Sequence, residues 1–224
     1  MWEGWKGKPY LAVAILKLLP LHWIAQPPSL EADLVAELPQ AGLKGVAPLT
    51  WWAAGLYGGQ LRRQLLHLRT SPSRPLVGAL IGGLVAGLRQ EPWVTPPLLV
   101  PIPSWKRQAN PLPALLTSCL TWELDWRQSP LLVRSRPVLG QHHLGRELRW
   151  ANQAGAFRCA SALAGQRRPV LLVDDILTTG ATACAAAAAL GQWGWQVAGM
   201  VCLGKTPRRD RDLGSSSCGS GGPG

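Results

Sequence analysis

Two adjacent aspartates, Asp174 and Asp175, follow the uninterrupted apolar run VLLV at residues 170–173. Behind them a turn of threonine, glycine and alanine, Thr178–Thr182, leads into an alanine-rich stretch. Carboxylates accept hydrogen bonds from hydroxyl groups, whereas the free backbone amides at the start of a helix attract an anion. These residue types therefore predict one site that holds a hydroxyl-rich group beside a phosphate.

The flanking sequence predicts the elements that must position this pair. The apolar run has no polar face, which is typical of a strand buried on both sides of a parallel sheet. Ligands of open α/β sheets bind beyond the carboxyl ends of such strands, where the two aspartates stand. We expect a helix at 181–193, whose N-terminal amides and positive dipole end face the same space.

The predicted phosphate site consists of the five residues of the turn. They are Thr178, Thr179, Gly180, Ala181 and Thr182. The carboxylates would repel a phosphate, so we assign Asp174 and Asp175 to the hydroxyls of a neighbouring sugar. A phosphate next to a diol describes a ribose 5-phosphate. The alternative is an ordinary capped helix, but the turn offers more polar groups than a cap requires. The lysine and glycine frame of a Walker A loop is absent.

Apolar runs elsewhere predict an alternation of strands and helices. Further strands are expected at 98–102, 131–134 and 196–203, with helices at 30–38, 51–68, 74–89, 112–126 and 144–158. Such alternation is typical of an α/β fold in which a mostly parallel central sheet is flanked by helices. The helix at 30–38 would belong to a helical N-terminal extension.

Positive charge is concentrated in the middle of the chain. The formal net charge of the 224 residues is +11, and residues 49–209 contain 18 basic against 6 acidic side chains. Of the 23 basic residues 17 are arginine, which makes fork-like contacts to phosphate. Two interpretations stay open: a generally basic surface, or a polyanionic ligand such as a phosphorylated small molecule or nucleic acid.

Cysteine usage and hydropathy indicate the compartment. The five cysteines include no C-x-x-C pair, which argues against a zinc ribbon and favours reduced thiols in the cytoplasm. The apolar segment 10–25 is interrupted by Lys17, Pro20 and His22. It is too short and polar to span a membrane, so we predict an amphipathic helix, with peripheral contact to the inner membrane face as the alternative.

The run VLLVDDILTTGAT resembles the phosphoribosyl-pyrophosphate signature of the type I phosphoribosyltransferases. Over roughly residues 50–207 the order of motifs is similar to the ComF/GntX-like branch of that family. The matching motifs are Tyr57-Gly58, Leu61-Arg62, Leu68-Arg69, Val100-Pro101-Ile102-Pro103, Arg107, Asn110, Gln141, Leu144, Arg149, Asn152, Phe157 and the acidic pair.

The resemblance implies a type I phosphoribosyltransferase-like fold and a set of site residues. Asp174 and Asp175 would hold the ribose 2- and 3-hydroxyls, and Thr178–Thr182 would surround the 5-phosphate. Lys106 and Arg107 would hold pyrophosphate, unless they belong to a solvated basic loop. Magnesium would be bound mainly through the substrate, with no metal ligand assigned to the protein.

The sequence departs from this family at several positions. Family members usually open with a four-cysteine zinc module, whereas residues 1–48 contain no cysteine. The family's Arg-Gly-Phe-Asn-Gln is Arg-Gln-Ala-Asn-Pro at 107–111, which changes the acceptor side of the site. We expect three parts: a non-zinc N-terminal extension (1–48), a phosphoribosyltransferase-like domain (49–207) and a disordered Gly/Ser-rich tail (208–224).

Three functions follow as alternatives. The first is an enzyme that transfers phosphoribose to an unknown acceptor and has a ComF-like role in DNA uptake for competence. The second is a non-catalytic sensor of phosphoribosyl pyrophosphate or a nucleotide. The third is a competence protein that handles single-stranded DNA, since aromatic side chains stack on bases. No residue is assigned a catalytic role, and the sequence does not indicate an oligomeric state.

Overall fold

The computed structural model describes residues 29–104, 110–136, 148, 152–160 and 168–207. The chain divides into two compact units, residues 1–37 and 38–224. The first unit contains helix α2 (Ser29–Glu37), which confirms the helix expected at 30–38. The division of the chain into three parts stays a prediction, because residues 1–28 and 208–224 lie outside the described residues.

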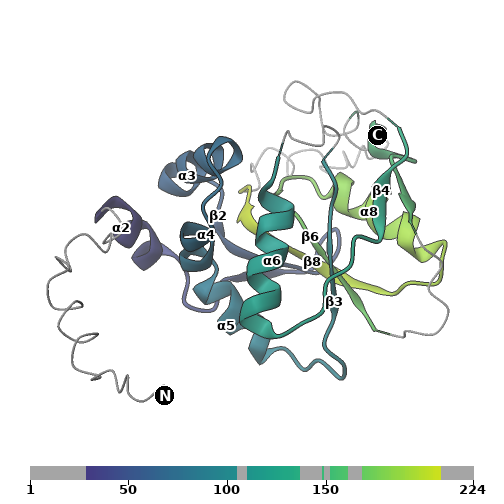
Figure 1. The fold of residues 1–224 in the computed structure, drawn as a ribbon, viewed down its shortest axis with the longest axis horizontal. Coiled ribbons are helices and arrows are strands. Elements are labelled where there is room, and N and C mark those ends of the chain that lie inside the picture. Colours follow the sequence, from purple (N-terminus) through teal and green to yellow (C-terminus); the bar gives the residue numbers. More distant parts are fainter. Residues whose placement is uncertain (1–28, 105–109, 137–147, 149–151, 161–167, 208–224) are drawn as a thin grey trace, which may run out of the picture. The chain divides into compact units, whose positions relative to one another are not determined.

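A mostly parallel sheet lies at the centre of the second unit (Figure 1). Its strand order is β1-β2-β8-β6-β3, and β7 pairs with β8 beyond the end of β6. The strands are β1 (Leu43–Gly45), β2 (Trp51–Leu56), β3 (Leu98–Pro101), β6 (Val170–Val173), β7 (Ile176–Leu177) and β8 (Val197–Lys205). The edge pair β1–β2 is antiparallel, and the other pairs are parallel. The predicted α/β architecture is therefore confirmed.

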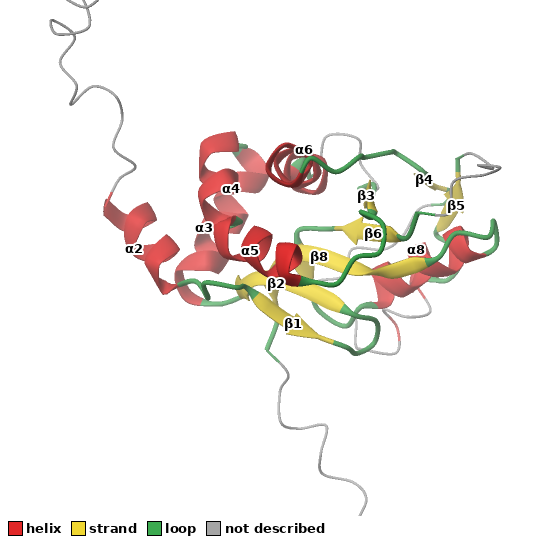
Figure 2. Ribbon diagram, turned by 90° about the horizontal axis from the view of Figure 1, so that it is seen from below, coloured by secondary structure: helices red, strands yellow, loops and turns green. Residues whose placement is uncertain are grey.

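Helices cover the sheet (Figures 1 and 2). They are α3 (Gly59–Thr70), α4 (Arg74–Leu80), α5 (Gly82–Gln90), α6 (Leu112–Leu124) and α8 (Ala181–Gly191). Helix α5 packs on β2, α6 packs on β3 and β6, and α8 packs on β6 and β8. In the described part of the chain, no helix combines the length and apolar character needed to cross a membrane.

Strand β6 is buried on both faces, as its sequence predicts. Val170 and Leu172 share a core cluster with Ala183 and Ala186 of α8. Because successive side chains of a strand point to opposite faces, Leu171 points to the other face of the sheet and is fully buried there. A strand between two packed layers has no position for a polar side chain until it reaches Asp174.

The predicted helix at 51–68 is wrong in its first part. Residues 51–56 form β2, which lies between β1 and β8 with four consecutive buried residues. A strand in that position needs apolar residues on both faces, so it lacks the alternation that would distinguish it from a buried helix. The helix begins at Gly59, after the Tyr-Gly-Gly break.

The predicted helix at 74–89 is divided at Ile81 into α4 and α5. Glycines of α5 allow a close approach to the chain segment before β1. A Cβ atom on Gly83 would lie 2.1 Å from the carbonyl oxygen of Pro39, and one on Gly87 would lie 2.1 Å from that of Ala41. These glycines allow two backbone segments to pack closely. The periodicity of apolar residues does not reveal this requirement.

The strand predicted at 131–134 exists but lies outside the central sheet. Strand β4 (Leu132–Arg134) pairs antiparallel with β5 (Phe157–Cys159) in a separate ribbon. Residues just before β4 follow the edge of the central sheet, where Ser129 N donates to Leu99 O at 3.0 Å. Strand β5 also contradicts the end of the helix predicted at 144–158, of which residues 144–147 and 149–151 lie outside the described residues.

Candidate functional site

The acidic pair forms an irregular step between β6 and β7, which both run along β8. Asp174 N donates to Val201 O at 3.0 Å, and Asp175 O accepts hydrogen bonds from Leu203 N and Gly204 N, each at 3.0 Å. The central strand therefore holds the backbone of both aspartates. The pair stands at the carboxyl end of β6, which is where the sequence predicts a ligand site.

The Asp175 side chain is turned into the protein. Its carboxylate is only 5% exposed, and Oδ2 accepts a hydrogen bond from Arg69 Nε at 2.8 Å. Arg69 Nη2 lies 2.7 Å from the same oxygen, and Asn110 Nδ2 donates to it at 2.8 Å. One cation and one neutral amide thus neutralise and orient this carboxylate. The prediction that it contacts a ribose hydroxyl is untested.

Asp174 has different surroundings. It keeps part of its surface exposed, and its Oδ1 accepts a hydrogen bond from Asp175 N at 2.9 Å. Burial, together with the neighbouring Asp175 carboxylate, raises the pKa of Asp174 well above its usual range, and Arg134 opposes this shift. Asp174 is therefore the carboxylate of the pair that gains most from new hydrogen-bond donors or positive charge.

Arg134 lies near Asp174 although its strand belongs to the separate ribbon. Its Nε donates to Pro103 O at 3.0 Å, and its Nη1 donates to Gln153 Oε1 at 3.1 Å. Its guanidinium carbon lies 4.1 Å from the centre of the Phe157 ring. Burial lowers the pKa of Arg134, and the Asp174 charge opposes this. Arg134 therefore brings a positive charge to the acidic pair from outside the central sheet.

Arg136, expected beside Arg134, contacts the flank of the ribbon instead. Its Nη2 donates to Asn152 O at 3.0 Å, and its Nε donates to Ala154 O at 3.2 Å. Asn152 is thus placed near Arg136 through its backbone. Arg149, the other residue of that predicted helix face, lies outside the described residues.

The predicted phosphate turn opens α8 as expected. Gly180 is the N-cap residue and has φ of 82°, a left-handed conformation that favours glycine. Thr179 Oγ1 accepts a hydrogen bond from Ala181 N at 3.4 Å, and Thr178 is exposed. Ala181 and Thr182 form the first turn of the helix. All five predicted residues therefore belong to one continuous turn beside the acidic pair.

Two contacts that the sequence did not predict hold this turn. A Cβ atom on Gly180 would lie 2.3 Å from Pro48 Cγ, so the β1–β2 connection packs directly on the turn. Lys205 Nζ donates to Thr178 O at 3.2 Å. Lys205 is the last residue of β8, so the rule that ligands meet the carboxyl ends of parallel strands could have identified it.

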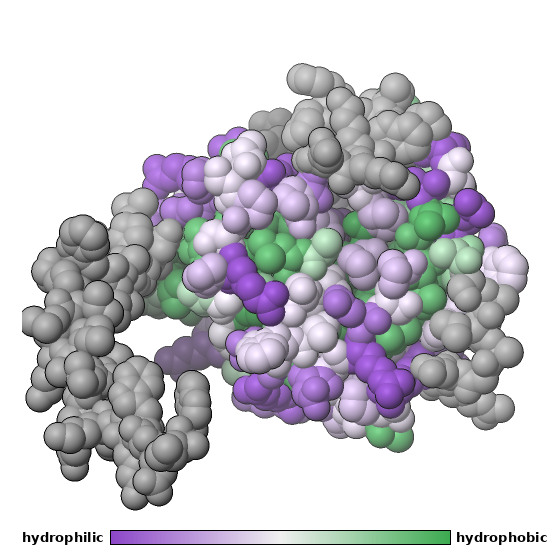
Figure 3. Space-filling view, in the orientation of Figure 1, coloured by the Kyte–Doolittle hydropathy of each residue, from purple (hydrophilic) through white to green (hydrophobic). Residues whose placement is uncertain are grey.

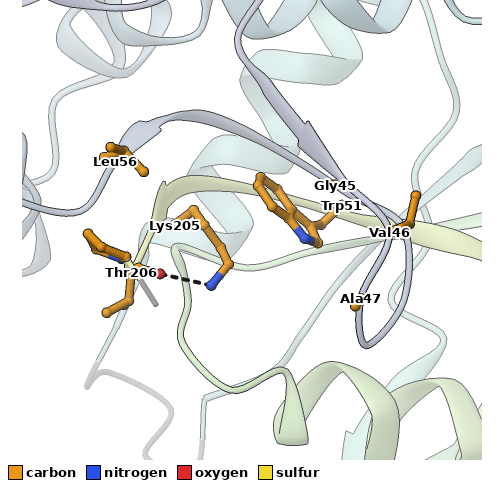
Figure 4. A pocket seen from close by; sticks show the side chains of 8 residues that line it. Gly45, Val46, Ala47, Trp51, Leu56, Lys205 and Thr206 are labelled. Carbon is orange, nitrogen blue, oxygen red and sulfur yellow. Dashed lines mark hydrogen bonds between the residues drawn. The ribbon is translucent and has the colours of Figure 1, made fainter. Parts of the chain in front are cut away.

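A hollow of about 370 Å³ adjoins the turn (Figure 4). It is lined by Gly45, Val46, Ala47, Trp51, Leu56, Lys205, Thr206 and Pro207. Lys205 Nζ lies 5.8 Å from the centre of the Trp51 ring and also donates to Thr206 O at 2.9 Å. The same lysine therefore forms a wall of the hollow and holds a carbonyl group of the phosphate turn.

The other predicted ligand contacts are outside the described residues. These are the pyrophosphate candidates Lys106 and Arg107. Described residues on both sides of them lie near the acidic pair, because Pro103 O accepts a hydrogen bond from Arg134 and Asn110 donates one to Asp175. The segment that carries Lys106 and Arg107 thus leaves and rejoins the described structure beside the acidic pair.

The remaining titratable groups of the site offer little chemistry. Burial raises the pKa of the Cys184 thiol and of the fully buried Cys202 thiol, so both are protonated at neutral pH. Within the ranges that the structure describes, no cluster of three or more His, Cys, Asp or Glu side chains could hold a metal ion. A metal ion at this site would therefore need ligands from the substrate or from other parts of the chain.

A basic surface flanks the site. Residues 38–90 contain six lysine or arginine residues and neither aspartate nor glutamate. Arg62 and Arg63 are exposed on α3, where hydrophilic residues gather in the space-filling view (Figure 3). Helix α3 also provides Arg69 to the acidic pair. The side of the site formed by α3 is therefore positively charged.

Comparisons with known proteins find limited similarity. No protein-family model matches the sequence. A protein named DNA utilization protein YhgH, from Escherichia coli O157:H7, is 32% identical to this chain over 103 residues, which are 46% of the chain. The chain spans only 44% of the length of that relative.

One solved structure with a similar arrangement is the adenine phosphoribosyltransferase from Leishmania donovani. The match has a TM-score of 0.42 and 16% sequence identity, and it covers 79% of this chain and 68% of that enzyme.

Proposed function

We propose that this protein is a ComF/GntX-like phosphoribosyltransferase-like protein that binds phosphoribosyl pyrophosphate or a nucleotide together with magnesium. One observation carries the proposal: the acidic pair and the left-handed turn of Gly180 lie consecutively at the carboxyl edge of a parallel sheet. The carboxylates suit sugar hydroxyls, and the amides that open α8 suit a phosphate. The partial match to a DNA utilization protein is compatible with a ComF-like role.

The assigned roles follow from the charges of the site. One carboxylate of the acidic pair would serve the ribose hydroxyls, and Thr178–Thr182 would surround the 5-phosphate. Arg69 and Arg134 lie beside the carboxylates, and their positive charges disfavour direct metal binding there. We therefore assign magnesium to the pyrophosphate oxygens and to water.

The reaction, if the bound ligand turns over, would break the bond between ribose C1 and pyrophosphate. Positive charge then develops on the sugar and negative charge on the leaving group. Lys106 and Arg107 would stabilise the pyrophosphate, and an amine or base would supply the electron pair for the new bond to C1. The mechanism requires no protein nucleophile.

Calorimetric titration with phosphoribosyl pyrophosphate and MgCl₂ tests the proposal. We expect the wild-type protein to bind and Asp174→Asn to weaken binding by about tenfold or more, because a hydrogen bond to a charged group is lost. Glu123→Gln is the matched control, since Glu123 is an exposed carboxylate at the end of α6. Absence of binding by the wild type, or equal binding by Asp174→Asn, would refute the proposal.

Release of pyrophosphate distinguishes an enzyme from a sensor. The protein is incubated with phosphoribosyl pyrophosphate, magnesium and a panel of nucleobases and amines. Pyrophosphate that appears only with one acceptor identifies transfer to that acceptor. Binding without release under every condition supports the non-catalytic alternative.

A second candidate function is supported by the exposed arginines of α3. Arg62 and Arg63 belong to the acid-free segment 38–90 and would attract the phosphates of single-stranded DNA. A mobility-shift assay should then show binding that weakens steeply with salt and falls in Arg62→Gln/Arg63→Gln. An unchanged shift in that double variant would remove this candidate.

A further inference from the structure

We propose that the two aspartates have divided roles: Asp174 contacts the sugar, whereas Asp175 is a positioning residue that joins α3 and the start of α6 to the site. This inference rests on the proposed function and makes it more specific. It departs from the symmetrical assignment that the sequence suggests, in which both carboxylates bind ribose hydroxyls.

The contacts of Asp175 occupy Oδ2, one of its two carboxylate oxygens, and its side chain is only 5% exposed. Its Oδ2 is contacted by Arg69 Nε, Arg69 Nη2 and Asn110 Nδ2, at 2.7–2.8 Å. A carboxylate oxygen has about two lone pairs, so this oxygen is fully occupied. A sugar hydroxyl that displaced one of these donors would leave a partly buried amide or guanidinium group without this partner, which is unfavourable.

Asn110 connects the same carboxylate to a helix. Its Oδ1 accepts a hydrogen bond from Leu112 N, at 3.2 Å, at the start of α6. Its Nδ2 donates to Asp175, so one side chain links the first turn of α6 to the acidic pair. Since Arg69 comes from the last turn of α3, Asp175 holds two helices against the step between β6 and β7.

Asp174 lacks such neutralisation. Its side chain accepts a hydrogen bond from Asp175 N and also interacts with the Asp175 carboxylate, and part of its surface stays exposed. Two charged groups and one thiol face it: Asp175, Arg134 and Cys202. Arg134 is itself engaged by Pro103 and Gln153, so it does not form a close ion pair with Asp174 in the way that Arg69 does with Asp175.

A charge-neutral pair of substitutions separates the two roles. Asp175→Asn alone should lower Tm, because it leaves the half-buried guanidinium of Arg69 unpaired. Adding Arg69→Gln removes that charge and should restore both Tm and affinity for phosphoribosyl pyrophosphate with MgCl₂. We expect the double variant to bind within about threefold of wild type, whereas Asp174→Asn should lose about tenfold or more.

The pH dependence of binding provides a further test, because a merely structural role of Asp175 would leave it unchanged. Removing the Asp175 charge lowers the pKa of Asp174, because that charge opposes its ionisation. Affinity that depends on ionised Asp174 should therefore persist to lower pH in Asp175→Asn/Arg69→Gln than in wild type. This loss of affinity at low pH should be absent from the weaker binding of Asp174→Asn.

The possible outcomes are distinct. Rescue by Arg69→Gln, with affinity that persists to lower pH, supports the division of roles. A double variant that is folded but binds as poorly as Asp174→Asn would overturn the division and leave the proposed function intact. A wild-type protein that does not bind the probe would remove the proposed function and this inference together.

Discussion

Asp174 and Asp175 are neighbours in sequence, yet the electrostatics around their carboxylates differ. Asp175 is paired with Arg69 and hydrogen bonded to Asn110, whereas Asp174 carries a raised pKa caused by burial and by Asp175 itself. Removing water from a carboxylate without a close cation disfavours its charged form. The site therefore holds one carboxylate that is satisfied within the protein and one that is not.

Stability should respond to the charge of Asp174. We expect Asp174→Asn to raise the free energy of unfolding at neutral pH by about 1 kcal/mol, because the amide oxygen can still accept from Asp175 N without a buried charge. The folded-state pKa is raised, so wild-type stability falls as pH rises from the unfolded pKa of about 4 through the folded pKa. The gain should therefore vanish below about pH 4.

Urea unfolding of both proteins across pH measures this effect. Asp33→Asn is the control, since Asp33 is an exposed carboxylate of α2. A gain of the same size at every pH, or a loss of stability at neutral pH, would contradict the electrostatic interpretation. Asp174→Asn should thus raise stability and weaken ligand binding, which is the combination expected when a binding residue is replaced.

The types of site residues could be predicted from the sequence, but their partners could not. The acidic pair and the turn are adjacent in the chain, and a local pattern is enough to find them. Arg69 and Asn110 lie 106 and 65 residues from Asp175. Pairing over such separations depends on how helices pack on the sheet, and the sequence does not state that packing.

At the scale of elements, the sequence correctly predicts those strands and helices whose apolar runs are bounded by prolines, glycines or aspartates. These are strands β3, β6 and β8 and helices α6 and α8. Strand β2 was mistaken for a helix because it is buried on both faces. The strand predicted at 131–134 forms as β4, whereas β5 replaces the end of a predicted helix, because its pairing with β4 is not visible in the local sequence pattern.

The turn before α8 depends on a glycine in a fixed conformation. We expect Gly180→Ala to destabilise the fold by about 2–4 kcal/mol, since a Cβ atom would be strained at φ of 82° and would collide with Pro48. Thermal unfolding by circular dichroism measures the loss. Gly191→Ala is the control, because a Cβ atom at the end of α8 meets no neighbour. Equal Tm values for the two variants would contradict the predicted strain.

At the scale of the whole molecule, the hydrophobic cluster described on the central sheet belongs to the second unit. Its residues lie between Leu43 and Cys202. The central sheet and the helices that pack on it also belong to residues 38–224. The first unit contributes none of the residues described at the acidic pair.

Residues 38–224 should therefore fold without residues 1–37. We expect the shortened chain to unfold cooperatively and to retain the affinity of the full chain for phosphoribosyl pyrophosphate with MgCl₂. Far-ultraviolet circular dichroism and calorimetry test this. A shortened chain that unfolds without a cooperative transition would show that the first unit is required for the stability of the second.

The link from Arg69 through Asp175 to Asn110 also constrains how the sequence can change over time. A single replacement at any of these positions leaves a buried polar group without its partner, so viable change requires compensating replacements. The three codons are far apart, and recombination between diverged genes would often separate them. Chimeras whose junction lies between residues 69 and 110, or between 110 and 175, should therefore be viable only when both parents share this trio.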